Sequence, residues 1–312
     1  MSGARRLRRL VGGAVAALTI AWTVAAVAAQ PSGVPIDDRG RSLHLGSPPA
    51  RIVSLAPHAT ELLAAAGAGE RLIAVDPHSD WPPRVRELPR VSAYPQIDLE
   101  RLLALRPDLV LVWGEGLSAS ALARMEGLGL KVFISEPSRL IEVATALERI
   151  ARALSPEASE AMLSESAGFA AARAFRGQLQ RIESTYAGRE PLRVFVQVWE
   201  APLMSISDRS VMGDALRRCG VINVLGDARS AAPQVTPEAV ARARPQLILA
   251  TRVEASDQRW RAGGLIGAAG ETQFLAFDAS RLERASPRML DPLAQLCEMI
   301  DARRARAVAP RP

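Results

Sequence analysis

This chain is poor in the residues that build metal sites and catalytic centres. Its 312 residues include three histidines and two cysteines, and aromatic side chains make up only 4% of the sequence. The histidines and cysteines do not have the spacing of a zinc site. The sequence also lacks a nucleophile elbow, a Walker loop and a dinucleotide fingerprint. No partner for catalysis is evident near His58 or His78, so we expect no enzyme, and a secreted hydrolase is the alternative.

Long hydrophobic runs are missing except near the N-terminus. Four arginines within residues 5–9 precede an apolar stretch over 11–27, and small residues suit cleavage after Ala28 or Ala29. This pattern predicts a signal peptide over 1–29 and export to the periplasm, by the general or the twin-arginine route. An uncleaved anchor is the alternative, although the stretch is short for a membrane span. No cysteine follows the site, so a lipid anchor is not indicated.

The net positive charge is also small once the predicted signal peptide is removed. Residues 1–29 hold four arginines and no acidic residue, so their loss lowers the formal charge from +6 to +2. Nucleic-acid binding needs many cationic contacts with phosphates. We therefore expect no nucleic-acid partner.

The chain does contain one sequence pattern twice, with the two copies 138 positions apart. DLERLLALRPDLVLV occupies residues 98–112, and TPEAVARARPQLILA occupies residues 236–250. Glu100 aligns with Glu238, and Pro107 aligns with Pro245. Each copy predicts a capped helix, a proline stop and a buried strand. The repeat therefore predicts an α/β fold of two similar lobes with mostly parallel sheets and separate cores, and a ligand cleft between the lobes.

The remaining segments complete the predicted organisation. Residues 30–49 are polar and rich in Gly, Ser and Pro, which predicts a flexible leader. A helical pattern over residues 155–186 predicts a helix of about 31 residues, roughly 46 Å long, that joins the lobes rigidly. A short helix is expected over residues 265–270. The domain boundaries that we expect are 50–140 for the N-terminal lobe, 141–190 for the linking helices and 191–308 for the C-terminal lobe.

Both cysteines fall in the predicted C-terminal lobe. Cys219 and Cys297 are 78 positions apart, and an oxidising compartment favours a disulfide between them. Loop-closure entropy gives such a disulfide about 4 kcal/mol of stabilisation. Two unrelated buried thiols are the alternative.

The few aromatic residues lie where a ligand would bind. Trp113 and Trp199 end predicted strands, and Trp81 and Tyr94 lie in loops after another strand. Ligands of parallel α/β sheets bind beyond the carboxyl ends of the strands. These positions predict a site for a large, flat, partly apolar ligand, although any single tryptophan could instead pack beneath a loop.

Several motifs together resemble one family of binding proteins. They are RIVSLAPHATELLAAAG, SDWPPRV, IDLERLLALRPDLVLVW, PQVTPEAVARARPQ and LERASPRM. In combination they resemble the periplasmic vitamin B12-binding proteins of ABC importers, within the helical-backbone (class III) solute-binding family. The match runs from about Arg51 to Asp301. Individually the motifs are also found in siderophore and haem binders of the same class.

The resemblance implies that the two lobes hold cobalamin or a related corrinoid as a ligand, with no resident cofactor or metal. It implies a monomer that delivers its ligand to a membrane permease, on which Glu100 and Glu238 would dock. It also implies the disulfide between Cys219 and Cys297. The implied ligand contacts, together with those expected from the aromatic pattern, are His78, Trp81, Tyr94, Trp113, Trp199, Met204, Ser280, Arg281, Leu282, Glu283 and Arg284.

This sequence departs from the family pattern at some of these positions. His78 replaces a tyrosine, and Met204, Arg281 and Leu282 replace aromatic residues. Trp199 has no aromatic counterpart and could restore part of the lost surface. These changes keep a haem or ferric siderophore as the alternative ligand. His78 is expected either to hydrogen-bond to the ligand or to coordinate its cobalt or iron.

Overall fold

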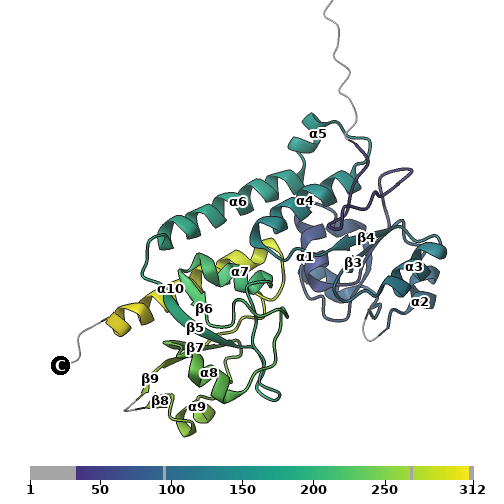
Figure 1. Ribbon diagram of the computed structural model, residues 1–312. Helices are drawn as coiled ribbons and strands as arrows, with labels where there is room; N and C mark the ends of the chain where they lie inside the picture. Colours follow the sequence, from purple (N-terminus) through teal and green to yellow (C-terminus); the bar gives the residue numbers. More distant parts are fainter. Residues whose placement is uncertain (1–32, 94–95, 268–269, 309–312) are drawn as a thin grey trace, which may run out of the picture.

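The computed structural model describes residues 33–93, 96–267 and 270–308. Within these residues two α/β lobes lie next to each other and are bridged along one side by helices (Figure 1). Each lobe contains a four-stranded parallel sheet, with the strand orders β2-β1-β3-β4 and β10-β7-β5-β6. The two-lobed α/β prediction is therefore confirmed. The predicted signal peptide over 1–29 lies outside the described residues.

The N-terminal lobe is a buried sheet with helices packed around it. Its strands are apolar on both faces, as parallel strands between helices require. The strands are β1 (Ile52–Ser54), β2 (Leu72–Val75), β3 (Leu109–Trp113) and β4 (Val132–Ser135), the α-helices are α1 (Pro57–Ala65), α2 (Leu99–Ala104) and α3 (Ala119–Gly127), and the 3-10 helices are η1 (Gly69–Arg71) and η2 (Pro83–Glu87).

The C-terminal lobe repeats this plan. Its sheet consists of β5 (Leu192–Gln197), β6 (Val221–Asn223), β7 (Leu247–Ala250) and β10 (Gln273–Ala276). In both sheets the first strand of the lobe pairs with the second and the third, and the fourth pairs with the third. The helices are α7 (Val211–Arg218), α8 (Pro237–Ala243), α9 (Gln258–Ala262), η3 (Pro287–Met289) and α10 (Leu290–Val308).

The repeated sequence pattern has the same conformation in both lobes. The helices α2 and α8 are each followed within two residues by an arginine in the left-handed region, Arg106 with φ 46° and Arg244 with φ 47°. A second arginine then binds the carbonyls at the end of each helix. Arg51 donates from Nη2 to the Leu105 carbonyl at 2.7 Å, and Arg193 donates in the same way to the Ala243 carbonyl at 2.6 Å. The duplication therefore includes the side chains that close each helix.

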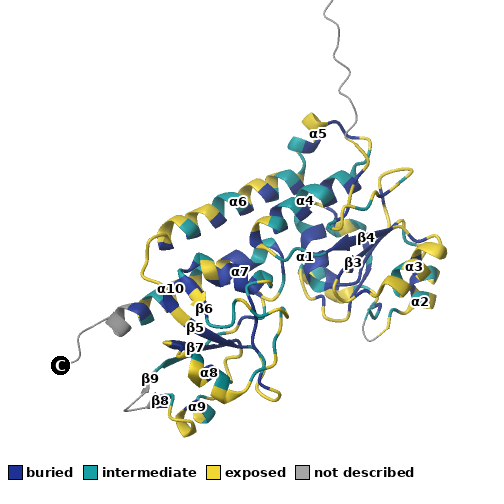
Figure 2. Ribbon diagram, viewed as in Figure 1, coloured by how far each residue is buried: buried dark blue, intermediate teal, exposed yellow. Residues whose placement is uncertain are grey.

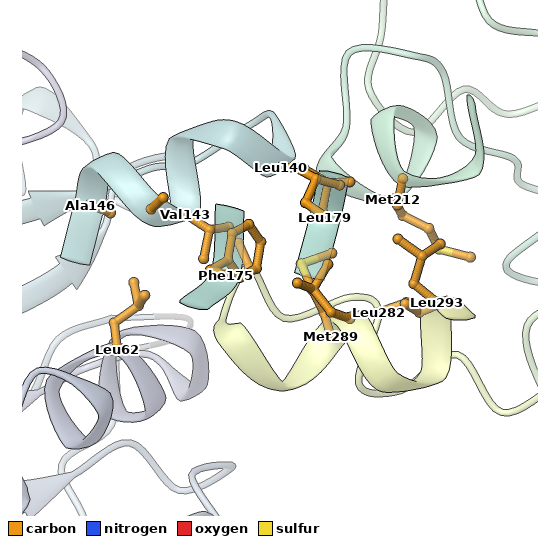
Figure 3. Close-up of a cluster of buried hydrophobic side chains, with 14 of the residues drawn as sticks. Leu62, Leu140, Val143, Ala146, Phe175, Leu179, Met212, Leu282, Met289 and Leu293 are labelled. Carbon is orange, nitrogen blue, oxygen red and sulfur yellow. The ribbon is translucent and has the colours of Figure 1, made fainter. Parts of the chain in front are cut away.

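The lobes do not have fully separate cores, in contrast to the prediction. One cluster of buried side chains runs from Leu62 on α1, through Phe175 on a linking helix, to Leu293 on α10 (Figure 3). The buried side chains on the other face of each sheet form separate clusters. One lies around Val110 in the N-terminal lobe, and the other lies around Trp260 in the C-terminal lobe. The shared core fixes the lobes relative to each other.

The long helix expected over residues 155–186 is divided into two shorter helices in the structure. Three helices form this region, α4 (Leu140–Leu154), α5 (Glu160–Ser164) and α6 (Ala167–Tyr186). A new helix begins after Ser166, because its hydroxyl accepts a hydrogen bond from the Phe169 amide and caps α6. With 20 residues, α6 is about 30 Å long. It buries one face and leaves the other in solvent (Figure 2).

The described part of the expected flexible leader is attached to the N-terminal lobe. Asp38 accepts a hydrogen bond from Arg149 of α4, and its amide donates to the Ile134 carbonyl of β4. Arg39 forms a two-point ion pair with Glu136, with its Nε 2.7 Å from the carboxylate. Polar composition suggested mobility, but these charged groups find partners on the lobe surface.

Two further predictions concern the C-terminal lobe. The disulfide is confirmed, because Cys219 after α7 is bonded to Cys297 on α10. The helix expected over 265–270 is wrong, since β8 (Ile266–Gly267) and β9 (Gly270–Glu271) pair as antiparallel strands there. The two glycines disfavour a helix in this segment. No helix among the described residues is long and apolar enough to span a membrane.

Candidate ligand-binding site

A cavity of about 500 Å³ lies between the two lobes. Its size falls in the range of about 300 to 1,000 Å³ that is usual for small-molecule sites. The wall is formed by residues that follow strands of both sheets, at the position expected for an α/β ligand site. From the N-terminal lobe these include 56–58, His78, Trp113, Glu115 and 136–138, and from the C-terminal lobe 209–211, Arg252, Ser280 and 283–285.

Trp113 is the large aromatic side chain in this wall. It is the last residue of β3 and is 48% exposed, although the four preceding residues of the strand are buried. A side chain at Gly116 would meet the ring at 3.0 Å, so glycine allows the following loop to turn close against Trp113. The structure therefore presents an indole ring to the cavity, as the strand-end position predicted.

Two histidines from the N-terminal lobe line the cavity. His78 follows β2, and its amide donates to the Asp76 carboxylate at 2.8 Å, which fixes the loop. Burial raises the pKa of Asp76 above its ordinary value. His78 thus lies in the cavity wall, and the Asp76 carboxylate holds its loop.

His58 is a wall residue that sequence analysis did not assign to the site. It lies at the start of α1, is 9% exposed, and its Nε2 is a buried atom without a hydrogen-bond partner in the described structure. Burial lowers the pKa of His58 to about 4, so the imidazole is neutral at neutral pH. Its position directly after β1 was the available signal, because residues after strands face the ligand.

Arg284 lies in the wall, but its guanidinium is bound to the opposite lobe. It donates from Nη1 to Glu61 of α1 at 3.1 Å and also to Asp80. Ser286 and Arg288 bind the same Glu61 carboxylate, which is buried. We call Glu61, Asp80, Arg284, Ser286 and Arg288 the inter-lobe ion cluster. The LERASPRM motif, expected to contact the ligand, therefore also connects the lobes.

The rest of the segment 280–284 divides between the cavity and the core. Ser280 and Glu283 are in the cavity wall. Leu282 is fully buried in the shared core, so it is not placed to contact a ligand as the resemblance implied. Arg281 is exposed and is not part of this wall. The reason is local, because the loop after β10 turns so that successive residues face different surroundings.

Trp81 lies outside the inter-lobe cavity. The Arg288 guanidinium is 4.2 Å from the centroid of its ring, which is a cation–π contact. Trp81 and Arg288 line a different cavity together with Glu70. The expectation that this tryptophan faces the ligand is not supported by its position, since its ring packs against the inter-lobe ion cluster.

Trp199 and Met204 face each other across a tight backbone bridge, in which the Met204 amide donates to the Trp199 carbonyl at 3.1 Å. Trp199 is 54% exposed and lines a smaller cavity beside the main one. Met204 is partly buried and is not in the wall of the inter-lobe cavity. Tyr94 lies outside the described residues.

Glu100 and Glu238 are exposed and lie in the first turns of α2 and α8, one on each lobe. The Glu238 pKa is lowered by its own backbone amide and by the Thr236 hydroxyl. A carboxylate at a helix start is favoured by the helix dipole. The Glu238 carboxylate therefore remains ionised at neutral pH, and both glutamates are exposed at the surface.

The arginines in the cavity wall differ in whether a carboxylate neutralises their charge. Arg284 is paired with two carboxylates, as described above, and Arg209 is exposed with no ion pair in the described structure. Among the described residues Arg252 has one carboxylate within ion-pair distance, Glu283 at 4.0 Å. No group of three or more His, Cys, Asp or Glu among the described residues could hold a metal ion.

The fold and the cavity define a two-lobed solute-binding protein, and comparison with known proteins assigns the family. The model of the family described as periplasmic binding protein matches residues 52–260. A vitamin B12-binding protein of Vibrio cholerae is 35% identical over 253 residues, which cover 80% of this chain and 88% of that protein. The vitamin B12-binding protein of Yersinia pestis is 32% identical over 250 residues, which cover 80% of this chain and 86% of that protein. The chain belongs to the periplasmic binding protein family.

Solved structures agree with this assignment. The crystal structure of the periplasmic vitamin B12-binding protein BtuF of Vibrio cholerae matches with a TM-score of 0.71 at 31% identity, covering 82% of this chain and 98% of that chain. The periplasmic haem-binding protein RhuT of Roseiflexus matches with a TM-score of 0.69 at 21% identity, covering 81% and 98%. The second likeness shows the shared fold alone.

Proposed function

We propose that this protein captures cobalamin or a related corrinoid in the inter-lobe cavity and delivers it to the permease of an ABC importer. One observation carries the ligand assignment. A cavity at the strand ends of both lobes, with the Trp113 ring in its wall, lies in a chain that is 35% identical to a vitamin B12-binding protein. A flat apolar ring system with amide side arms suits an aromatic wall that has polar groups at its edge.

Titration of the purified protein with cyanocobalamin tests this assignment. We expect saturable binding with one site per chain and a Kd below the micromolar range. The absorbance of the corrin ring and isothermal calorimetry give independent readings. Absence of binding at micromolar concentration would rule out this ligand.

A haem or ferric siderophore is the second candidate because of the charges in the cavity. His58 and His78 offer imidazoles, which bind iron, and Arg209 and Arg252 are available to pair with carboxylates. Titration with haemin under the same conditions separates the two ligands. Tighter binding of haemin than of cyanocobalamin would favour this alternative.

Delivery to the permease is the second part of the proposal. Glu100 and Glu238 occupy equivalent exposed positions on the two lobes, and paired carboxylates would bind basic residues of a symmetric membrane partner. The protein would act in the periplasm as a monomer after removal of the signal peptide. Mass spectrometry of the mature N-terminus and light scattering of the purified protein test these two points.

A further inference from the structure

A second cavity of about 320 Å³ lies beside the inter-lobe cavity. Its wall is formed by residues 197–201, which follow β5, and by residues of the segment 252–255, which follows β7. Arg252 belongs to the walls of both cavities, so the two adjoin at this side chain. We call the second cavity the Trp199 compartment.

Trp199 forms a fixed, exposed platform in this compartment. Its indole Nε1 donates to the Ala201 carbonyl at 3.0 Å, and its backbone is held by the bridge to Met204. The side chain nevertheless remains 54% exposed. Because its only polar atom is already satisfied, the ring offers an apolar face on which a flat group can stack.

Arg252 stands at the junction and is available to an anion. Its side chain is 44% exposed, and its nearest carboxylate, Glu283, is 4.0 Å away, at the limit of an ion pair. Arg284, also in the main cavity wall, is instead bound to both Glu61 and Asp80. A guanidinium with free donors binds phosphate by two parallel hydrogen bonds.

The acidic residues in the wall limit which chemical groups fit the Trp199 compartment. Glu200 and Glu254 are the acidic residues in the wall of the compartment, and both are exposed. They would oppose an anion deep in the compartment. The arrangement therefore suits a neutral aromatic group on Trp199, joined through a phosphate that lies at Arg252.

We propose that the Trp199 compartment binds the nucleotide end of a corrinoid, with the base stacked on Trp199 and the phosphate at Arg252, while the corrin ring occupies the inter-lobe cavity. This inference rests on the proposed function. The compartment would allow the protein to distinguish complete corrinoids from precursors that have the same ring but no nucleotide.

Comparison of cyanocobalamin with dicyanocobinamide, which lacks the nucleotide, tests the inference. We expect the wild-type protein to bind cyanocobalamin at least about tenfold more tightly, because stacking on one aromatic side chain commonly contributes this much. The Trp199→Ala and Arg252→Ala variants should bind cyanocobalamin as weakly as cobinamide. The affinity of Trp199→Ala for cobinamide should equal that of the wild type, because Trp199 is not in the wall of the inter-lobe cavity.

Conservative variants and a surface control keep the test specific. Trp199→Phe retains a flat ring and should keep most of the preference. Arg252→Lys retains the charge without the forked donors and should keep part of it. Arg242→Ala, an exposed arginine on α8 away from both cavities, should change neither affinity. Thermal unfolding of each variant confirms that it is folded, and the conservative pair suffices if an alanine variant is not.

The outcomes separate this inference from the proposed function. If the wild type binds neither corrinoid, the proposed function fails and the inference fails with it. If the wild type binds both with equal affinity, only the inference is overturned. It is also overturned if Trp199→Ala loses affinity for both ligands equally, since the compartment would then contact the ring.

Discussion

The two lobes share one framework but differ in what they bring to the cavity. In both, an arginine in the left-handed region follows the repeated helix, and a second arginine binds the carbonyls at the helix end. The N-terminal lobe then contributes Trp113 and two histidines, whereas the C-terminal lobe contributes three arginines, Ser280 and Glu283. These residues lie in loops and at element ends around the cavity. A duplicated scaffold can therefore carry different ligand-facing side chains in its two lobes.

The lobes also meet through buried charge, and this contact provides the largest expected effect. Glu61 accepts hydrogen bonds from Arg284, Ser286 and Arg288 of the other lobe. The Glu61→Ala variant should lower the free energy of unfolding by about 3 to 5 kcal/mol, because it removes a buried carboxylate that two arginines and a serine share. Urea denaturation measures the change.

A matched control for Glu61 lies on the surface nearby. Glu70 pairs with Arg84 at 3.2 Å, but its side chain is 85% exposed. The Glu70→Ala variant should cost about 1 kcal/mol or less. Equal effects of the two substitutions would show that the inter-lobe ion cluster does not connect the lobes.

The buried histidine of the N-terminal lobe predicts that stability depends on pH. The pKa of His58 is lowered by burial to about 4, whereas the unfolded chain keeps the ordinary value of 6.5. The unfolded state therefore binds a proton between these values and the native state does not. Stability should fall by about 3 kcal/mol as the pH decreases from about 6.5 to about 4.

Denaturation of wild-type protein and of His58→Asn at several pH values isolates this effect. The difference in stability between the two proteins should change across that window and be constant above it. If the two profiles stay parallel throughout, His58 does not titrate as its burial requires.

Variants of two tryptophans in the N-terminal lobe should distinguish a residue that contacts the ligand from one that helps to connect the lobes. Trp113 is in the cavity wall, and Trp81 packs on Arg288. The Trp113→Ala variant should weaken cyanocobalamin binding by about 2 kcal/mol, or roughly 30-fold in Kd. Trp81→Ala should leave Kd unchanged and reduce stability. Calorimetric titration and thermal unfolding give both quantities, and the opposite pattern would exchange the two roles.

The smallest effect on binding is expected at the paired surface carboxylates. Replacing Glu100 and Glu238 together by alanine should leave ligand affinity unchanged, because neither residue is in the cavity wall. Uptake of labelled cobalamin by cells should fall. Loss of ligand binding in the purified double variant would contradict a docking role.

The sequence predicted features that are encoded locally. The repeat and the position of Trp113 at the end of β3 depend on neighbouring residues and spacing, whereas the disulfide followed from the expected compartment and the family resemblance. His58 could have been found by the same rule for strand ends. Local signals failed where two conformations are close in energy, as at Ser166, where a side-chain cap starts a new helix within a segment of helical composition.

The roles of residues that join the lobes could not be predicted in this way. Arg284 and Glu61 are 223 positions apart, and nothing in either segment identifies the other as its partner. Leu282 lies in a predicted ligand-contacting segment but faces the shared core. Asp38 lies in a polar segment, yet it pairs with Arg149. These outcomes depend on tertiary packing rather than on local pattern.

Hydrogen–deuterium exchange with and without cyanocobalamin tests most directly whether both lobes bind one ligand. Protection should appear together in the strand-end segments of the two lobes, near residues 78, 113–115, 209–211, 252 and 280–285. Protection confined to one lobe, or located away from these segments, would contradict a site shared between the lobes.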